Sequence, residues 1–489
     1  MSIGSLDLAV LIAYVACVLG VGFATRRRTG GASDYLLGAR DLPWWALLLS
    51  IVATETSAVT VLSTPGLAFG GGLKGSTGDL RFLQVPLGYV VGRLVVVAWL
   101  LPLYCRGQVM TAYEVLAHRF GGGVRKLASV IFLVTRTLGD GLRLYLTALV
   151  LKLLLPIDLT TAVAIMGTVA LVYTWAGGMR AVVWTDVLQF GVYMAGAFAA
   201  FAVLLAALPG GTGDVIAALG ERGRVFDFSF DLTSKYTFWT GLIGGAVLSL
   251  GSHGVDQMIV QRYLAARSQQ QAALALLLSG VVVLLQFAFF LVLGVGLAVF
   301  YAASPPATPF ATGDDVFVDF IVHHTPDGVR GLVVGAVFAA ALSGSLNSCA
   351  SSLVNDVVLP LRGLPPDHPS ALRLAKGATL LFGGLQIAVG ASGLGLHGRT
   401  VIEQVLGIAA LTLGLLLGLF ALGTLTSRVR EGHALIGLVA GVAVDLALKF
   451  GVPGLLAPSP LDGLWYGAVG AGTVFVAGVA ASVLSSPRR

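Results

Sequence analysis

The stretch Trp44–Gly66, WWALLLSIVATETSAVTVLSTPG, has the length of a membrane span but a polar middle. Glu55 and several hydroxyl side chains lie at its centre. Hydrocarbon offers no hydrogen-bond partners, so these groups must face protein, water or a ligand. One interpretation is a polar helix face that contacts a neighbouring helix through Ser and Thr. We prefer the other, a helix broken at mid-membrane whose carbonyls and hydroxyls coordinate a cation beside a solute.

The composition is that of a membrane protein. Of 489 residues, 56% are hydrophobic and only 11% are charged, and apolar runs long enough to cross a bilayer recur from end to end. Cys17, Cys105 and Cys349 form no C-x-x-C pair, so we expect neither redox chemistry nor a thiolate metal site. We attribute the net charge of +6 to Lys and Arg at the cytoplasmic ends of helices, not to nucleic-acid binding.

We predict thirteen membrane spans within one membrane-embedded unit, residues 1–489. They are 5–25, 44–66, 81–104, 124–153, 160–176, 183–207, 237–261, 271–302, 330–360, 371–394, 400–426, 433–449 and 464–484. Placing residues 26–43 inside concentrates most Lys and Arg residues in the inside loops. This predicts a multi-pass protein of the plasma (inner) membrane with its amino terminus outside and its carboxyl terminus cytoplasmic. The first apolar run has no cleavage-site pattern, so we expect a retained span and not a signal peptide.

A second interrupted helix is predicted in span 237–261, where two glycines flank His253. Ser249 and Ser252 lie beside it, and Asp256 follows. His253 is the only histidine deep in a span, so a multi-histidine metal site is not expected. Two interpretations of this side chain remain open, a satisfied hydrogen-bonding residue and a ligand.

The two interrupted spans lie five spans apart, as expected for a transporter built from inverted repeats. The first repeat would be residues 44–207 and the second 237–426. The span 5–25 would precede them, and two trailing helices in 433–484 would follow.

Other polar groups are predicted inside the membrane. Asp140 lies four residues after Arg136 and three before Arg143, so all three can share one helix face, and a structural salt bridge between helices is the favoured interpretation. Asp186 is either an acid at a helix start or an ion ligand. The small and hydroxyl residues of span 330–360 indicate either tight helix packing or an ion or water path.

Four ordered motifs resemble the solute–sodium symporter family, which includes sodium–glucose and sodium–proline cotransporters. They are DYLLGARDLPWW at 34–45, GGMRAVVWTD at 177–186, QMIVQRYLAA at 257–266, and Asn347-Ser348 followed by Asp356. The resemblance covers residues 5 to about 440. It implies an all-α membrane protein with a five-plus-five inverted-repeat (LeuT-like) core and sodium-driven uptake by alternating access.

The resemblance also implies a sodium site. Two of its backbone carbonyls map to Ala53 and Thr56, and a third maps to Val337. The two hydroxyl positions of the family map to Ala340 and Ala341, which is a departure because a hard cation needs oxygen ligands.

The resemblance implies three further residues of the cation site. Ser343 and Asp186 match an additional sodium site of some members, and Glu55 matches a coupling carboxylate of the proline carriers. Glu55 would then either replace the lost hydroxyls and keep sodium bound, or titrate, so that the carrier runs on protons or without coupling. Sodium is the preferred coupling ion.

The resemblance also implies solute-binding positions on the two broken helices and on the helix after the first. They are Ser57, Thr60, Arg81, Gln84, Ser249, Ser252 and His253. The aromatic and amide residues of the sugar carriers are not matched at most of them. Arg81 in the cavity could bind a carboxylate through two hydrogen bonds, which favours a monocarboxylate or an amino acid over a sugar. Alternatively, Arg81 lies at the outer interface and reaches water.

Other classes of protein fit the sequence less well. A channel needs a continuous polar pore, and an enzyme needs a nucleophile–base pair or a metal cluster. A solute sensor on a transporter scaffold remains an alternative. The expected partners are a small solute, sodium and the lipid bilayer, with no cofactor, no transition metal, no nucleic acid and no obligatory protein partner.

Overall fold

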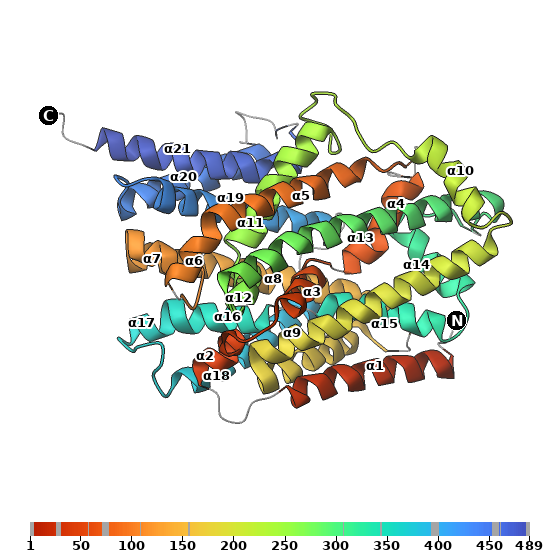
Figure 1. Ribbon diagram of the computed structural model, residues 1–489, viewed down its shortest axis with the longest axis horizontal. Helices are drawn as coiled ribbons and strands as arrows, with labels where there is room; N and C mark the ends of the chain where they lie inside the picture. Colours follow the sequence, from red (N-terminus) through yellow and green to blue (C-terminus); the bar gives the residue numbers. More distant parts are fainter. Residues whose placement is uncertain are drawn as a thin grey trace.

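The computed structural model describes residues 4–25, 31–56, 58–70, 78–107, 109–154, 157–306, 308–342, 345–392, 401–451, 459 and 461–485. Over these residues the chain is helical, with no strand beyond a single bridge between Leu42 and Ala266. Figure 1 shows most of the long helices running along the long axis of the molecule. Within the described residues, seven helices are long and apolar enough to cross a membrane, or eight if a bent pair counts as one span. The predicted all-α membrane architecture is confirmed, and the number of thirteen spans stays a prediction.

The first half of the chain contains α1 (Ser5–Ala24), α2 (Ala32–Leu37), η1 (Gly38–Arg40), α3 (Trp44–Glu55), α4 (Ala58–Gly70), η2 (Arg81–Leu83), α5 (Gln84–Val95), η3 (Val96–Leu100), α6 (Leu101–Gly107), α7 (Glu114–Phe120), α8 (Gly122–Leu154), α9 (Leu159–Ala207) and α10 (Thr212–Arg222). The second half contains η4 (Thr240–Gly244), α11 (Gly245–Gly254), α12 (Gln257–Leu264), α13 (Gln269–Ala303), α14 (Gly313–His324), α15 (Val329–Leu342), α16 (Leu346–Ser352), η5 (Leu353–Val358), α17 (Leu359–Leu361), α18 (Ala371–Ser392), α19 (Val401–Leu425), α20 (Glu431–Phe450), η6 (Gly463–Trp465) and α21 (Tyr466–Leu484). The short helices α10 and α14 lie in the two long connections between predicted spans.

Both predicted helix breaks are present. The backbone leaves the helical region at Thr56 (φ −74°, ψ 111°). The axes of the helical segments on either side of this break differ in direction by 61°. The second break separates α11 from α12, where Asp256 is extended (φ −80°, ψ 119°) and caps the amide of Met258.

The motif glycine Gly178 has a steric reason to be glycine. It has φ 58° and ψ −147° inside α9, which holds both predicted spans 160–176 and 183–207. An added Cβ at Gly178 would lie 2.3 Å from the carbonyl oxygen of Tyr35. The left-handed backbone and the close approach of α2 both exclude a larger side chain.

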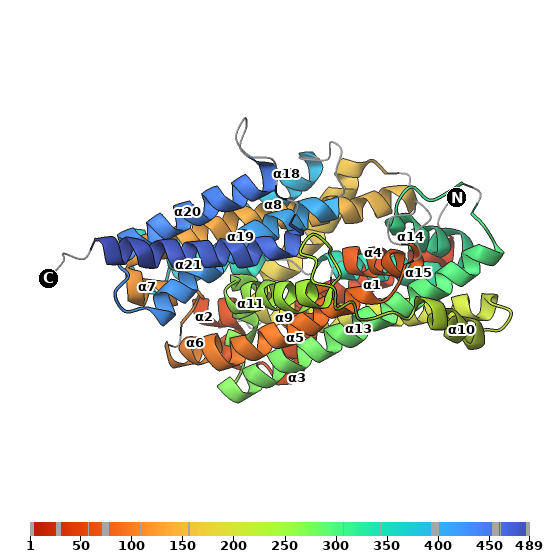
Figure 2. The ribbon, with the colours of Figure 1, turned by 90° about the horizontal axis from the view of Figure 1, so that it is seen from above.

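Two large apolar clusters hold the bundle together around the breaks. Helix α13 contributes to both, with Val283 in one and Phe290 in the other. Helices α19, α20 and α21 approach closely through glycines, and Figure 2 shows them side by side. A Cβ at Gly437 of α20, for example, would lie 2.4 Å from the carbonyl oxygen of Val474 in α21. This packing leaves the interrupted helices, with their polar residues, inside an apolar scaffold.

Candidate functional site

The two interrupted helices meet at their breaks. Glu55, the last residue of α3, pairs with the fully buried guanidinium of Arg93 in α5. His253, next to the last residue of α11, lies with its Nε2 3.5 Å from the same carboxylate. Arg93 also donates to His253 Nε2 at 3.0 Å and to Ser279 Oγ at 3.0 Å. The side chains at both breaks therefore share one buried arginine.

The residues next to this cluster extend it along α11. Ser252 Oγ lies 2.9 Å from His253 Nδ1, and Ser249 donates to the carbonyl of Tyr89 at 3.0 Å. His253 is thus a satisfied hydrogen-bonding residue in this conformation, one of the two interpretations left open by the sequence. Both ring nitrogens are within hydrogen-bond distance of a neighbour.

Asp186 is not at a helix start. It is fully buried in the interior of α9, which corrects the interpretation as an interfacial acid. Ser50 of α3 donates to its carboxylate at 2.5 Å, and Arg262 of α12 donates at 3.0 Å. Arg262 is itself 1% exposed and also donates to Ser50 Oγ at 3.0 Å. One cation ligand implied by the family resemblance therefore contacts a guanidinium in this conformation.

The remaining cation residues lie on two helices. Ala53 is buried near the end of α3, and Thr56 accepts a hydrogen bond from Gln286 Nε2 at 2.9 Å. A helix end leaves last-turn carbonyls without intrahelical partners, so this break supplies candidate oxygen ligands. Val337 is buried in α15.

Four of the predicted residues are placed only in part or lie outside the described residues. Ala340 and Ala341 belong to the last turns of α15, and Ser343 lies outside the described residues. Ser57, among the predicted solute residues, also lies outside them, and Thr60 is on α4.

Arg81 and Gln84 do not reach the cluster at the breaks. Arg81 pairs with Asp79 at 2.6 Å and with Asp227 at 3.0 Å, and its side chain is 30% exposed. The buried Gln84 amide donates to the carbonyls of Arg81 and Tyr236 and accepts from the amide of Asp227. Both residues thus fix the connection between α10 and η4, which matches the outer-interface alternative for Arg81.

Several polar residues near the breaks were missed as site residues. Tyr193 and Gln286 both hydrogen-bond to the Thr56 hydroxyl at the first break. Arg136 of α8 pairs with Asp256 at the second break. Gln286 stands within the apolar run VVVLLQFAFF, and this isolated amide was a usable sequence signal. Arg136 was expected in a structural salt bridge between helices, and its partner Asp256 is the cap of α12.

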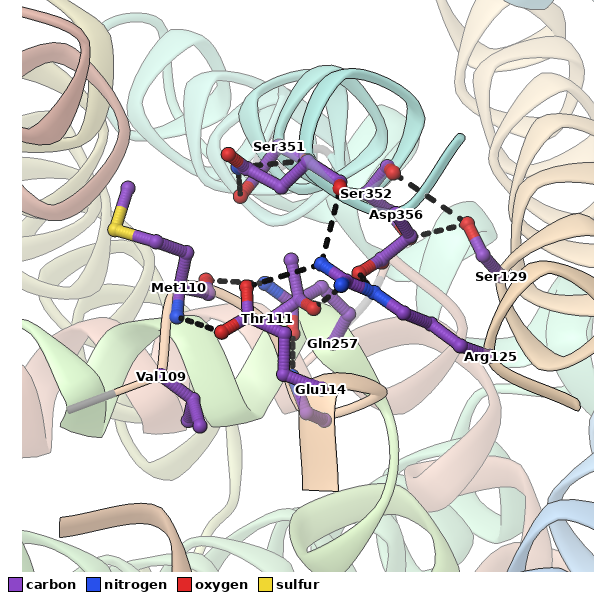
Figure 3. Close-up of polar contacts among 12 residues, drawn as sticks. Val109, Met110, Thr111, Glu114, Arg125, Ser129, Gln257, Ser351, Ser352 and Asp356 are labelled. Atoms are coloured by element: carbon purple, nitrogen blue, oxygen red, sulfur yellow. Dashed lines mark hydrogen bonds and ion pairs between the residues drawn. The ribbon is translucent and has the colours of Figure 1, made fainter. Parts of the chain in front are cut away.

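Two motif residues converge at the end of the bundle where α6 ends and α8 begins. Figure 3 shows Asp356 between Thr111, which donates at 2.5 Å, and Arg125, which donates at 2.8 Å. Gln257 accepts from the amide of Ala112 at 2.7 Å. The segment between α6 and α7 is therefore tied to both η5 and α12.

The comparison with known proteins points to one family. Residues 35–441 match the group described as the Sodium:solute symporter family. The chain is 28% identical to the sodium/sialic acid symporter SiaT of Proteus mirabilis, over 99% of this chain and 96% of that protein. It is 31% identical to sodium-coupled monocarboxylate transporter 1 of Xenopus laevis, over 93% and 73% of the two chains. It is 32% identical to the human sodium/iodide cotransporter, over 92% and 70%.

Solved structures agree on the fold. The substrate-bound outward-open state of a Na⁺-coupled sialic acid symporter matches with a TM-score of 0.86 at 28% identity, over 99% of each chain. Mhp1, a nucleobase-cation-symport-1 family transporter, matches with a TM-score of 0.56 at 11% identity, over 95% of this chain and 97% of its own, a likeness of fold alone. The predicted LeuT-like fold is confirmed. The match over most of the chain, with relatives above 30% identity, shows that this protein belongs to the sodium:solute symporter family, a group of sodium-coupled transporters and not of enzymes.

Proposed function

We propose that this protein transports a small carboxylate-bearing solute, a monocarboxylate or an amino acid, together with sodium by alternating access. The observation that carries the proposal is the meeting of the two interrupted helices, where Glu55, Arg93 and His253 lie in contact. Broken helices that meet at mid-membrane are where transporters of this kind bind ion and solute.

The balance of buried charges supports an anionic solute. Four acids near the breaks each contact a basic residue: Glu55 with Arg93, Asp186 with Arg262, Asp256 with Arg136, and Asp140 with Arg143 at 3.8 Å. A sodium ion would add a positive charge to this balanced set, and a charge in low dielectric is costly unless it is paired. A carboxylate carried with the ion would neutralise it, whereas a sugar would not. The sodium-coupled monocarboxylate transporter among the relatives agrees with this class.

The proposed cation ligands are those implied by the family pattern. The carbonyls of Ala53, Thr56 and Val337 would bind the ion, with Glu55 compensating for the alanines at 340 and 341. Asp186 and Ser343 would form an additional site. Since Glu55 and Asp186 each contact an arginine here, the proposal requires these contacts to loosen as sodium enters.

The placement in the membrane is also a proposal. Residues 44–207 and 237–426 form the two repeats, and the amino terminus lies outside the plasma membrane. The distribution of Lys and Arg along the loops supports this orientation.

Uptake by proteoliposomes tests the proposal. A sodium gradient and a proton gradient are imposed separately, and labelled short monocarboxylates, amino acids and sugars are offered in turn. We expect concentrative uptake of a carboxylate only with inward sodium. A proton gradient that suffices without sodium, or a preference for uncharged sugars, would overturn it. Solute binding without concentrative uptake would indicate a sensor.

A further inference from the structure

An aromatic stripe on the connection between α10 and η4 has no role in the proposed transport site. Phe226, Phe228 and Phe230 are 48%, 64% and 74% exposed, although they lie outside the predicted membrane spans. Phe226 and Phe228 stack with centroids 5.7 Å apart and an interplanar angle of 11°. Polar residues alternate with them in the stretch FDFSFD, residues 226–231. The segment thus presents apolar rings on one side.

The polar residues of the same stretch face the protein or water. Asp227 pairs with Arg81 at 3.0 Å and with Arg224 at 3.1 Å. Hydrogen bonds from Ser229 hold the pKa of Asp227 below its ordinary value, so the carboxylate stays charged. The stretch is therefore amphipathic, with charge on one side and aromatic rings on the other.

The stripe is fixed at the depth where a membrane helix begins. The amide of Phe238 donates to the carbonyl of Asp227 at 2.6 Å, and Phe228 lies 5.0 Å from the Phe238 ring. Phe230 contacts Trp239, the residue just before η4, with centroids 6.3 Å apart. Farther along, Asp462 donates its amide to the carbonyl of Leu232 at 3.0 Å and caps η6, the start of the α21 span. Figure 1 shows this connection projecting at the edge of the bundle, beyond the ends of α11 and α21.

We propose that Phe226, Phe228 and Phe230 dock into the lipid surface of the bilayer at this end of the protein. Aromatic side chains are favoured at membrane–water interfaces, and the neighbouring span starts fix the stripe at that level. The exposed Arg224 and Lys235 on the same connection can reach the headgroup phosphates. The lipid contact would hold the connection that carries the partners of Arg81 and Gln84.

Site-directed fluorescence in phosphatidylcholine vesicles tests the docking. An environment-sensitive dye is attached to Phe226→Cys, Phe228→Cys or Phe230→Cys, after Cys17 and Cys105 are replaced by Ala and with buried Cys349 retained. Ser229→Cys and Thr233→Cys, from the exposed polar residues of the same connection, are the matched controls. We expect nitroxide lipids to quench the dye at the three Phe positions, and aqueous iodide to quench it there several-fold less than at the controls. Equal iodide quenching at all five positions would overturn the proposal.

The unmodified chain provides a second measurement. A photoactivatable phosphatidylcholine is cross-linked in vesicles, and its adducts are mapped by mass spectrometry. We expect adducts within 226–230 and none at the control position Thr233. Shielding from iodide without lipid quenching or adducts would mean that a protein, such as a second copy of the chain, covers the stripe, and would overturn the proposal.

Discussion

Asp186 and Arg262 are 76 positions apart in the chain and yet form a buried pair, with exposures of 0% and 1%. Glu55 and Arg93, on α3 and α5, form a second pair, in which Arg93 is fully buried and Glu55 is 17% exposed. A buried charge in a low-dielectric interior is tolerated only when it is paired and hydrogen-bonded. At the scale of single residues, the site near the breaks is therefore a set of mutually neutralised charges.

The Glu55–Arg93 pair gives the first prediction. Arg93→Met leaves a buried carboxylate without its guanidinium and should destabilise the protein by about 3–5 kcal/mol, whereas Glu55→Gln with Arg93→Met should recover most of this loss. Thermal unfolding of the purified variants measures both. Arg224→Met, at a 58% exposed arginine paired with Asp227, is the control and should cost about 0–1 kcal/mol. An Arg93→Met variant as stable as the control would contradict the importance of the pair.

Glu55→Gln alone separates the two proposed roles of this carboxylate. If Glu55 compensates for the alanines at 340 and 341, the variant should lose most of its sodium stimulation, because a neutral amide holds a cation less tightly. Uptake at varied sodium concentration is the measurement. Asp158→Asn, at the exposed cap of α9, should leave the sodium dependence unchanged. Sodium stimulation that survives in full in Glu55→Gln would exclude Glu55 as the compensating ligand.

Glu114 on α7 gives a pH-dependent prediction outside the membrane spans. Burial raises the pKa of Glu114 above its ordinary value, partly offset by Arg125. A raised folded-state pKa means that its contribution to stability is present below the unfolded pKa and is lost as pH rises through the folded pKa. The difference in Tm between wild type and Glu114→Gln should therefore fall as pH rises through this window.

Asp231→Asn is the control, and its Tm difference from wild type is expected to change with pH in the opposite direction. A hydrogen bond from Thr233 lowers the pKa of Asp231, so its small contribution is present above the unfolded pKa and is lost on acidification. The Tm difference between wild type and this variant should rise with pH. Tm differences that change with pH in the same direction for both variants would contradict the opposite pKa shifts of Glu114 and Asp231.

At the scale of elements, the interruptions matter as much as the helices. Helix α5 approaches η4 so closely that a Cβ at Gly88 would lie 2.4 Å from the carbonyl oxygen of Gly241. This contact positions α5, and with it Arg93, against α11 and His253. Small residues permit such approaches between membrane helices.

Gly88→Ala tests this packing. The added methyl group would force α5 away from η4, and we expect a loss of about 1–3 kcal/mol together with reduced uptake. Gly191→Ala, on the exposed side of α9 with nothing within 4 Å of the added Cβ, is the control. It should be neutral or stabilising by up to about 1 kcal/mol, because alanine favours a helix. Thermal unfolding and uptake are compared; equal effects of the two substitutions would contradict the close-packing argument.

At the scale of the whole molecule, polar contacts tie the bundle together at both ends. One set joins Arg81 and Gln84 to the α10–η4 connection. The other joins the α6–α7 segment to η5 through Thr111 and Asp356. Alternating access requires opposite ends to open in turn, so each set must separate during the transport cycle.

A cross-link between Thr111→Cys and Asp356→Cys should therefore inhibit transport, with uptake restored by reduction. The control pair is Ser129→Cys with Ser352→Cys, whose hydroxyls lie 2.7 Å apart. Their helices α8 and α16 both pack on α18, so they should move together, and this cross-link should leave uptake intact. Undiminished uptake by the cross-linked first pair would show that this end does not open.

The sequence by itself determined the helical membrane architecture, the breaks near residues 56 and 255, and the residues with buried charge. These features are local, since hydropathy, glycine and polar interruptions act within a few residues along the chain.

Only the tertiary structure decided which residues the charged side chains contact. The family resemblance implied Arg81 as a solute residue, with the outer interface as the alternative, and the structure pairs it with Asp227, 146 residues away in the chain. His253 contacts Arg93 across 160 residues, and Arg136 contacts Asp256 across 120. Pairing energies depend on distance in space and on burial, which sequence spacing does not encode beyond one helix face. That is why the charged residues of the site could be named in advance and their pairing could not.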